Sequence, residues 1–133
     1  MSDEVLLIVL AGAWLVVHVC AHGFAQWATA GNAWALGARD DPPRETQLNG
    51  RLRRACANYL ETLPAVLAVL VAVELSGRAN ELTAYGGWVW FCGRAVYLPA
   101  YASGIPGLRS IAWGVAMFAI VAMVLGFVLG ASP

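Results

Sequence analysis

The chain has 133 residues, of which 60% are hydrophobic and only 12% are charged. Its mean hydropathy of +0.67 is far from that of a soluble domain of this size and places it among integral membrane proteins. Eight Arg balance eight acidic residues and Lys is absent, so no net charge attracts nucleic acid or an acidic partner.

Four segments are long and apolar enough to cross a bilayer as helices, which takes about 20 residues each. They cover residues 5–30, 55–75, 82–102 and 108–129. Lipid cannot satisfy free backbone groups, and the segments lack the alternation that a transmembrane barrel requires, so only helices can span here. We therefore expect an all-α integral membrane protein in which residues 1–133 form one four-helix bundle.

Polar residues on the first segment form a stripe of their own. His18, His22 and Gln26 follow one another at intervals of four and share a helix face. Two His without a third ligand nearby are weak evidence for a metal, and we predict no metal site. Polar stripes on membrane helices more often form hydrogen bonds within the bundle, so this one should face neighbouring helices.

The connections between the segments differ in length. Residues 31–50 form a polar, proline-containing loop, whereas the stretches 76–81 and 103–107 leave room only for tight turns. Because these two turns are short, the second, third and fourth helices should be sequential antiparallel neighbours.

The distribution of Arg predicts the orientation in the membrane. Five of the eight Arg lie between the first and second segments: Arg39, Arg44, Arg51, Arg53 and Arg54. Arg109 follows the last turn, whereas only Arg78 lies in the turn at the other end. The positive-inside rule then places the 31–50 loop and the 103–109 turn in the cytoplasm, and we expect a multi-pass integral membrane protein.

The second segment begins with a line of polar side chains, which are Arg51, Arg54, Asn58 and Glu61. Their offsets of 0, 3, 7 and 10 fall within roughly 80° of one another on a helix. A carboxylate in hydrocarbon costs several kcal/mol unless it is paired or solvated, so Glu61 needs a cation, a polar cavity or a proton. We therefore predict a buried polar site on this face.

The third segment carries a second polar line, made of Arg94, Tyr97 and Tyr101. At about 1.5 Å per residue, Glu61 lies roughly 9 Å inside the start of the second helix and Arg94 roughly 12 Å from the inner end of the third. Matching depths on antiparallel neighbours predict an ion pair between these two residues, which would offset part of their desolvation cost.

That pair does not explain the cations, the amide and the phenols that gather toward the same end of the bundle. Arg binds carboxylates through two parallel hydrogen bonds, and Tyr supplies a directional hydroxyl. The set therefore suits a small polyanion with several carboxylates or amides, while the lipid side stays open to an apolar substrate.

Three motifs follow one another through the second, third and fourth segments. They are Arg51-x-x-Arg54-x-x-x-Asn58-x-x-Glu61-x-x-Pro64, Gly93-Arg94-x-x-Tyr97-x-x-x-Tyr101 and Arg109-Ser110. In this order and spacing the chain resembles the MAPEG family, the membrane-associated proteins of eicosanoid and glutathione metabolism. The resemblance is to a bacterial-type member and implies a place in a bacterial inner membrane.

The resemblance implies a homotrimer of four-helix subunits that holds glutathione as a co-substrate between subunits, near the cytoplasmic side. The residues that it implies for glutathione binding are Arg51, Arg54, Asn58, Glu61, Arg94, Tyr97 and Tyr101. Arg109 matches the Arg that stabilises the thiolate in glutathione-using members. A guanidinium near sulfur lowers the thiol pKa and so raises the fraction of nucleophile.

The implied activity is that of a glutathione-dependent transferase or peroxidase acting on lipophilic electrophiles or lipid hydroperoxides from the bilayer. Thr62 stands where conjugating members tend to have Tyr, and Ala57 where prostaglandin-isomerising members tend to have Arg, so the reaction stays open. Since some relatives bind lipids or proteins without catalysis, the alternative is a non-catalytic lipid-binding or scaffold protein. A third possibility is a small four-helix exporter of hydrophobic cations. Such exporters carry their essential Glu on the first helix, whereas Glu61 of this chain lies on the second.

Overall fold

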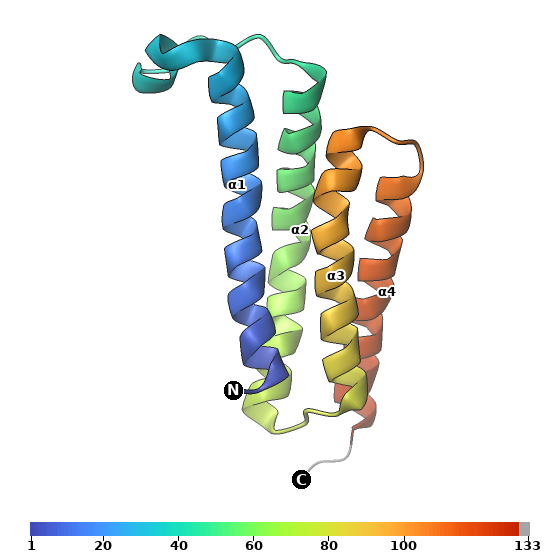
Figure 1. The fold of residues 1–133 in the computed structure, drawn as a ribbon. Helices are drawn as coiled ribbons and strands as arrows, with labels where there is room; N and C mark the ends of the chain where they lie inside the picture. The colour runs from blue at the N-terminus through green and yellow to red at the C-terminus, as the bar shows by residue number, and fades with distance from the viewer. Residues whose placement is uncertain (131–133) are drawn as a thin grey trace.

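The computed structural model describes residues 1–130, and within this range the chain forms four α-helices and no strand. They are α1 (Asp3–Leu36), α2 (Gln47–Ser76), α3 (Glu81–Ser103) and α4 (Leu108–Leu129). Figure 1 shows them side by side and antiparallel, with the start of α1 and the end of α4 at the same end of the bundle. The predicted all-α, four-helix architecture is confirmed.

Three of the helices, α1, α2 and α4, are long and apolar enough to cross a membrane. The third helix, α3, has 23 residues and is therefore long enough, but it is not among the three. Its polar residues Thr83 and Arg94 are buried in the bundle, so they lower the hydropathy of α3 without facing lipid. The expectation of four apolar spans is thus confirmed for three helices.

The first connection is shorter than predicted, because both flanking helices extend into it. α2 begins at Gln47, eight residues before the expected start at residue 55, and Thr46 caps it by accepting a hydrogen bond from the Asn49 N–H (3.2 Å). α1 continues to Leu36. The length of an apolar run marks where a helix enters lipid and not where the helix ends. The sequence prediction therefore made both helices too short at this end.

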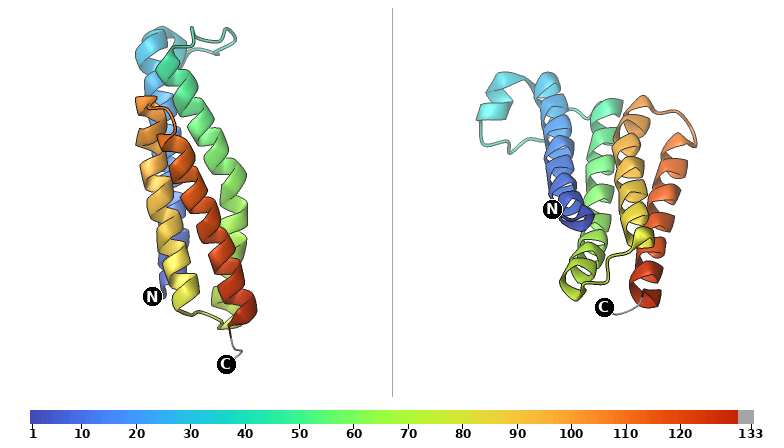
Figure 2. Two further views of the ribbon diagram at one scale, coloured as in Figure 1. Left: turned by 90° about the vertical axis from the view of Figure 1, so that its right-hand side faces the viewer. Right: turned by 60° about the horizontal axis from the view of Figure 1, so that its bottom comes forward.

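α1 is interrupted at Gly31, whose φ of 81° and ψ of 173° are not helical. A φ in this range favours glycine, which has no Cβ to clash with the backbone. After this break the helix continues in a new direction, and Figure 2 shows the segment running sideways away from the bundle.

Tight turns join α2 to α3 and α3 to α4, so the three helices are sequential antiparallel neighbours, as predicted. α3 and α4 pack most closely, because small residues face each other across their contact. Gly93 lies against Ala112 and Ala116, and Gly86 lies against Ala119 and Met123. The close packing of this hairpin fixes α4, and with it Arg109, relative to the polar face of α3.

Candidate functional site

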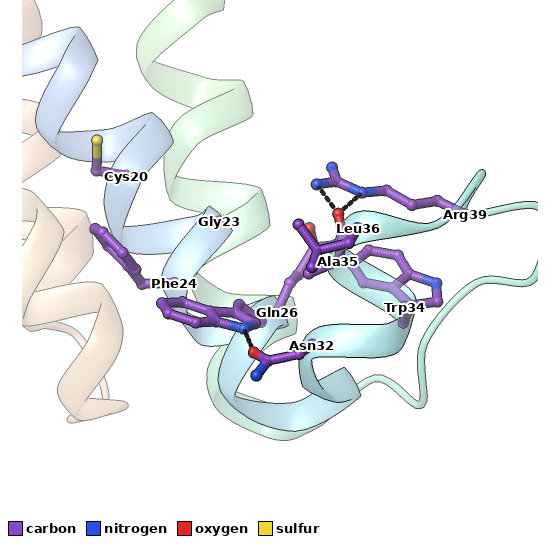
Figure 3. Close-up of a pocket in the computed structure, with 10 residues that line it drawn as sticks. Cys20, Gly23, Phe24, Gln26, Asn32, Trp34, Ala35, Leu36 and Arg39 are labelled. Carbon is purple, nitrogen blue, oxygen red and sulfur yellow. Dashed lines mark hydrogen bonds between the residues drawn. The ribbon is translucent and has the colours of Figure 1, made fainter.

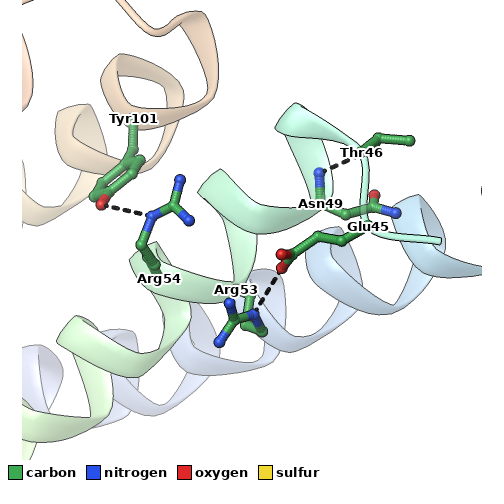
Figure 4. Close-up of polar contacts among 6 residues, drawn as sticks. All are labelled: Glu45, Thr46, Asn49, Arg53, Arg54 and Tyr101. Atoms are coloured by element: carbon green, nitrogen blue, oxygen red, sulfur yellow. Dashed lines mark hydrogen bonds and ion pairs between the residues drawn. The ribbon is translucent and has the colours of Figure 1, made fainter. Parts of the chain in front are cut away.

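Three Arg side chains and Tyr101 line one cavity at the end of the bundle where α3 turns into α4. Arg54 of α2 donates a hydrogen bond from Nε to the Tyr101 hydroxyl (3.3 Å), as Figure 4 shows. The guanidinium carbon of Arg109 lies 4.8 Å from the centre of the Tyr101 ring. Cations over an aromatic face are held by its quadrupole, so Tyr101 positions both groups.

The third Arg, Arg51, is positioned by the turn between α3 and α4. Its Nη1 donates to the carbonyl oxygen of Ala102 (3.3 Å), and its guanidinium lies directly under Gly104. Gly104 has a φ of 72° and ends α3 as a left-handed cap. A side chain at Gly104 would collide with Arg51, so the glycine allows this close approach as well as the turn.

These residues line two adjoining cavities, which we together call the arginine cleft. One, of about 290 Å³, lies among the three Arg and the α3–α4 turn; the other, of about 480 Å³, is lined by Asn58, Tyr97, Trp113 and Gly114. Tyr101, Arg109 and Ser110 line both cavities. The cleft therefore runs from a cationic end to an end with more aromatic character.

Within residues 1–130 no carboxylate forms an ion pair with the three Arg at the cationic end. The one ion pair in the part that the structure describes joins Arg53 to Glu45 (3.0 Å), on a different side of α2 from Arg54, as Figure 4 shows. Arg54 and Arg109 are exposed and Arg51 is half-buried, so all three are accessible to a ligand. Three accessible guanidinium groups without a protein carboxylate make a site that suits an anion.

Arg94 lies behind the cleft with its side chain fully buried. Its Nη1 donates to the Asn58 side-chain oxygen (3.1 Å), and its guanidinium carbon lies 4.7 Å from the Tyr97 ring centre and 5.2 Å from that of Tyr59. Its Nε and Nη2 have no hydrogen-bond partner within residues 1–130. Arg94 is thus held largely by aromatic faces.

The predicted ion pair between Glu61 and Arg94 is wrong. Arg94 points into the bundle and bonds to Asn58, whereas Glu61 is exposed on α2. Equal depth along two helices fixes only the axial position of a side chain. The direction in which each side chain points is set by packing, which turns Arg94 inward and leaves Glu61 outside.

The structure brings most of the predicted site residues together. Those that line the arginine cleft are Arg51, Arg54, Asn58, Tyr97, Tyr101 and Arg109. Arg94 contributes from behind through its bond to Asn58, and Glu61 lines neither cavity.

Sequence reasoning missed two residues near this site. Trp113 lines the cleft four residues after Arg109, a helical spacing that places both on one face of α4 and was therefore available as a signal. Tyr59 lies under Arg94, bonds through its hydroxyl to the Ala11 carbonyl (2.8 Å) and stacks on His18, with ring centres 4.5 Å apart. His18 therefore faces a neighbouring helix, as the stripe on the first segment predicted.

An all-helical bundle with three membrane-spanning helices defines an integral membrane protein, and its polar residues converge on a cationic cleft at one end. The model of the MAPEG family matches residues 5–129, nearly the whole chain. The chain belongs to the MAPEG family, which includes glutathione transferases and peroxidases. None of the curated proteins compared with the chain matches it.

Proposed function

We propose that the protein is a membrane-embedded, glutathione-dependent transferase or peroxidase that acts on lipophilic electrophiles or lipid hydroperoxides. The observation that carries this proposal is that Arg51, Arg54 and Arg109 line one cavity with Tyr101, and that none of them forms an ion pair with a carboxylate within residues 1–130. Membership of the MAPEG family supports glutathione as the anion.

The chemistry of the cleft fits glutathione, which carries two carboxylates, an ammonium group and a thiol. Arg51 and Arg54 lie side by side at the cationic end and suit the carboxylates, because guanidinium and carboxylate form paired hydrogen bonds. Asn58 and Tyr97 add polar groups for the peptide bonds in the second cavity. Glu61, on the exposed face of α2, is the acidic group suited to the ammonium.

Arg109 is the proposed catalytic residue because it lines both cavities and so lies where the two ends of the cleft meet. A guanidinium close to a thiol favours the thiolate, which is the nucleophile in both conjugation and peroxide reduction. The Trp113 end of the cleft suits the lipophilic partner, since its ring adds apolar surface beside Arg109. This lipophilic substrate is either a membrane lipid itself or a molecule dissolved in the bilayer.

A homotrimer is part of this proposal. Glu61 is exposed on the single subunit, although it lies on a membrane-spanning helix, and a carboxylate facing lipid is costly. A neighbouring subunit placed on this face of α2 removes Glu61 from lipid and closes the side of the glutathione site.

The test is a titration of the purified protein in detergent with glutathione, which follows binding by calorimetry and thiolate formation by ultraviolet absorbance near pH 7. Arg109→Ala should abolish the thiolate signal while largely keeping the calorimetric affinity, and Arg54→Ala should weaken binding about tenfold, a loss of about 1.4 kcal/mol. Arg53→Ala is the matched control, because Arg53 is the neighbour of Arg54 but points to Glu45.

Two results would contradict the proposal. Unchanged thiolate formation in Arg109→Ala removes the catalytic assignment. A folded protein that binds no glutathione favours the alternative, a non-catalytic lipid-binding or scaffold protein in which the polar residues serve folding and assembly.

A further inference from the structure

A second cavity, unconnected with the arginine cleft, lies between α1 and the bent segment that follows Gly31. Its volume is about 570 Å³, within the range of small-molecule sites. The residues that line it are Cys20, Gly23, Phe24, Gln26, Trp27, Asn32, Trp34, Ala35, Leu36 and Arg39. Figure 3 shows the two walls, with Cys20 and Phe24 on α1 and Trp34 and Leu36 on the bent segment.

The depth of this cavity matches the boundary between hydrocarbon and headgroups. From Asp3 to Gly31 α1 rises about 42 Å, which is the thickness of a bilayer with its headgroups. Phe24 then lies about 10 Å, and Cys20 about 16 Å, below the break. The inner part of the cavity is therefore at the level of acyl chains, and the bent segment is at the level of headgroups.

The aromatic walls are held in place and present apolar faces. The Trp27 indole N–H donates to the Asn32 side-chain oxygen (2.6 Å), and that of Trp34 donates to the Asp41 carbonyl (2.7 Å). Each indole therefore has its polar atom satisfied by the chain itself. What remains for an occupant is apolar ring surface, together with the exposed side chains of Phe24 and Leu36.

A single cation stands at the headgroup end of the cavity. Arg39 donates from Nε (3.2 Å) and Nη2 (2.8 Å) to the Ala35 carbonyl, two bonds that Figure 3 shows, and its guanidinium carbon lies 5.1 Å from the Trp34 ring centre. It pairs with no carboxylate within the described part of the chain. Its positive charge is thus fixed at the rim, with Nη1 left to bind an anion.

The backbone at Arg39 is itself unusual, with a φ of 60° in the left-handed region. This conformation is unfavourable for a residue with a Cβ and persists only where surrounding contacts maintain it. Here the bonds to Ala35 and the stacking on Trp34 maintain it, and both bring the guanidinium back over the cavity.

We propose that this cavity binds a membrane phospholipid, with one acyl chain between α1 and the bent segment and the phosphate at Arg39. The apolar walls lie at the depth of acyl chains, and the fixed cation lies at the depth of phosphate groups, so one molecule meets both. Charge complementarity with Arg39 selects a phospholipid over an uncharged lipid.

The test compares two lipids with the same acyl chains, phosphatidylglycerol and diacylglycerol, which lacks the phosphate. Native mass spectrometry counts the lipid molecules that the delipidated protein retains in detergent. We expect phosphatidylglycerol to bind at least tenfold more tightly than diacylglycerol. Equal retention of the two lipids would overturn the assignment of the phosphate to Arg39.

Two pairs of variants locate the site. Gly23→Leu places a side chain in the cavity and Gly12→Leu places one on α1 elsewhere, and a Cβ at either position meets no atom within 4 Å, so both variants should fold. Arg39→Gln removes the cation and Arg44→Gln removes a loop cation that does not line the cavity. Gly23→Leu and Arg39→Gln should each lower phosphatidylglycerol retention about tenfold, while their partners leave it unchanged.

Equal retention within each pair would overturn the proposal, as would a wild-type protein that retains no lipid because a second copy of the chain covers the cavity. None of the four variants changes a residue that lines the arginine cleft. Loss of glutathione binding would therefore leave this result intact, and failure of the lipid test would leave the proposed activity intact.

Discussion

At the scale of single residues, the bond between Arg94 and Asn58 links the buried core to the arginine cleft. Arg94 has no exposed surface, and the Asn58 oxygen is the one side-chain acceptor that it contacts within residues 1–130. Asn58 is also one of the residues that line the cleft. A substitution at Asn58 should therefore change both the stability of the protein and its affinity for a ligand in the cleft.

Asn58→Ala should destabilise the protein by about 1–3 kcal/mol, because it leaves a buried guanidinium without its acceptor. Asn58→Asp keeps an oxygen in the same place and should retain most of the stability. Thermal unfolding in detergent, without glutathione, separates the two variants. Equal melting temperatures for the wild type and Asn58→Ala would show that the aromatic faces of Tyr59 and Tyr97 hold Arg94 unaided.

The residue scale is also where prediction from sequence was least complete. The types and spacing of Arg51, Arg54 and Tyr101 predicted their common face, and the structure brings them together. The partner of Arg94 depended on how α2 is rotated about its axis against α3, which depth along the helices does not specify. Asn58 and Glu61 are within one helical turn, and packing alone decided between them.

At the scale of elements, the α3–α4 turn positions a cation as well as reversing the chain. Gly104 and Gly107 both have positive φ, 72° and 81° respectively. A Cβ at Gly104 would meet the Arg51 guanidinium, whereas one at Gly107 meets nothing within 4 Å. Substitution of either glycine should therefore strain the backbone, but only substitution of Gly104 should displace Arg51.

Gly104→Ala and Gly107→Ala should each cost about 1–2 kcal/mol of stability, the penalty for a side chain in the left-handed region. Only Gly104→Ala should also weaken glutathione binding, by about tenfold, because it displaces Arg51 and its paired bonds to a carboxylate. Calorimetry on both variants at a temperature where both are folded makes the comparison. Equal affinities would show that Arg51 does not contact the ligand.

Elements were more predictable than their ends. Apolar runs of about 20 residues located all four helices, since this length is set by the bilayer. The same runs carried no information on the polar ends, where Thr46 begins α2 outside lipid and Gly31 bends α1. The cavity between α1 and the bent segment lies at such an end, and the sequence assigned one of its two walls to a loop.

At the scale of the whole molecule, the 37–46 connection and the α3–α4 turn lie at one end of the bundle, and the start of α1 and the end of α4 lie at the other (Figure 1). The excess of Arg at the first end predicts that it is cytoplasmic. In a cysteine-free background, Glu81→Cys should react with a membrane-impermeant maleimide in intact cells, and Arg44→Cys only after permeabilisation. Both positions are exposed, so the reverse pattern would invert the orientation.

The proposed homotrimer rests on the position of Glu61. It lies about 9 Å beyond Ala55 along a membrane-spanning helix, is exposed on the subunit and forms no ion pair within residues 1–130. Because a carboxylate at this depth is costly in lipid, we propose that neighbouring copies of the chain in the homotrimer cover it.

Native mass spectrometry in mild detergent should therefore give three times the 14.1 kDa subunit mass. Glu61→Leu should weaken the trimer, because a leucine on this face is stable in lipid and no longer requires a neighbour, and it should lower glutathione affinity by removing the group suited to the ammonium. Arg53→Leu, which changes a residue on another side of α2, should leave the trimer intact. A wild-type protein that stays a single subunit would contradict the proposed homotrimer. The arginine cleft of one subunit would then have to bind glutathione without a neighbouring subunit.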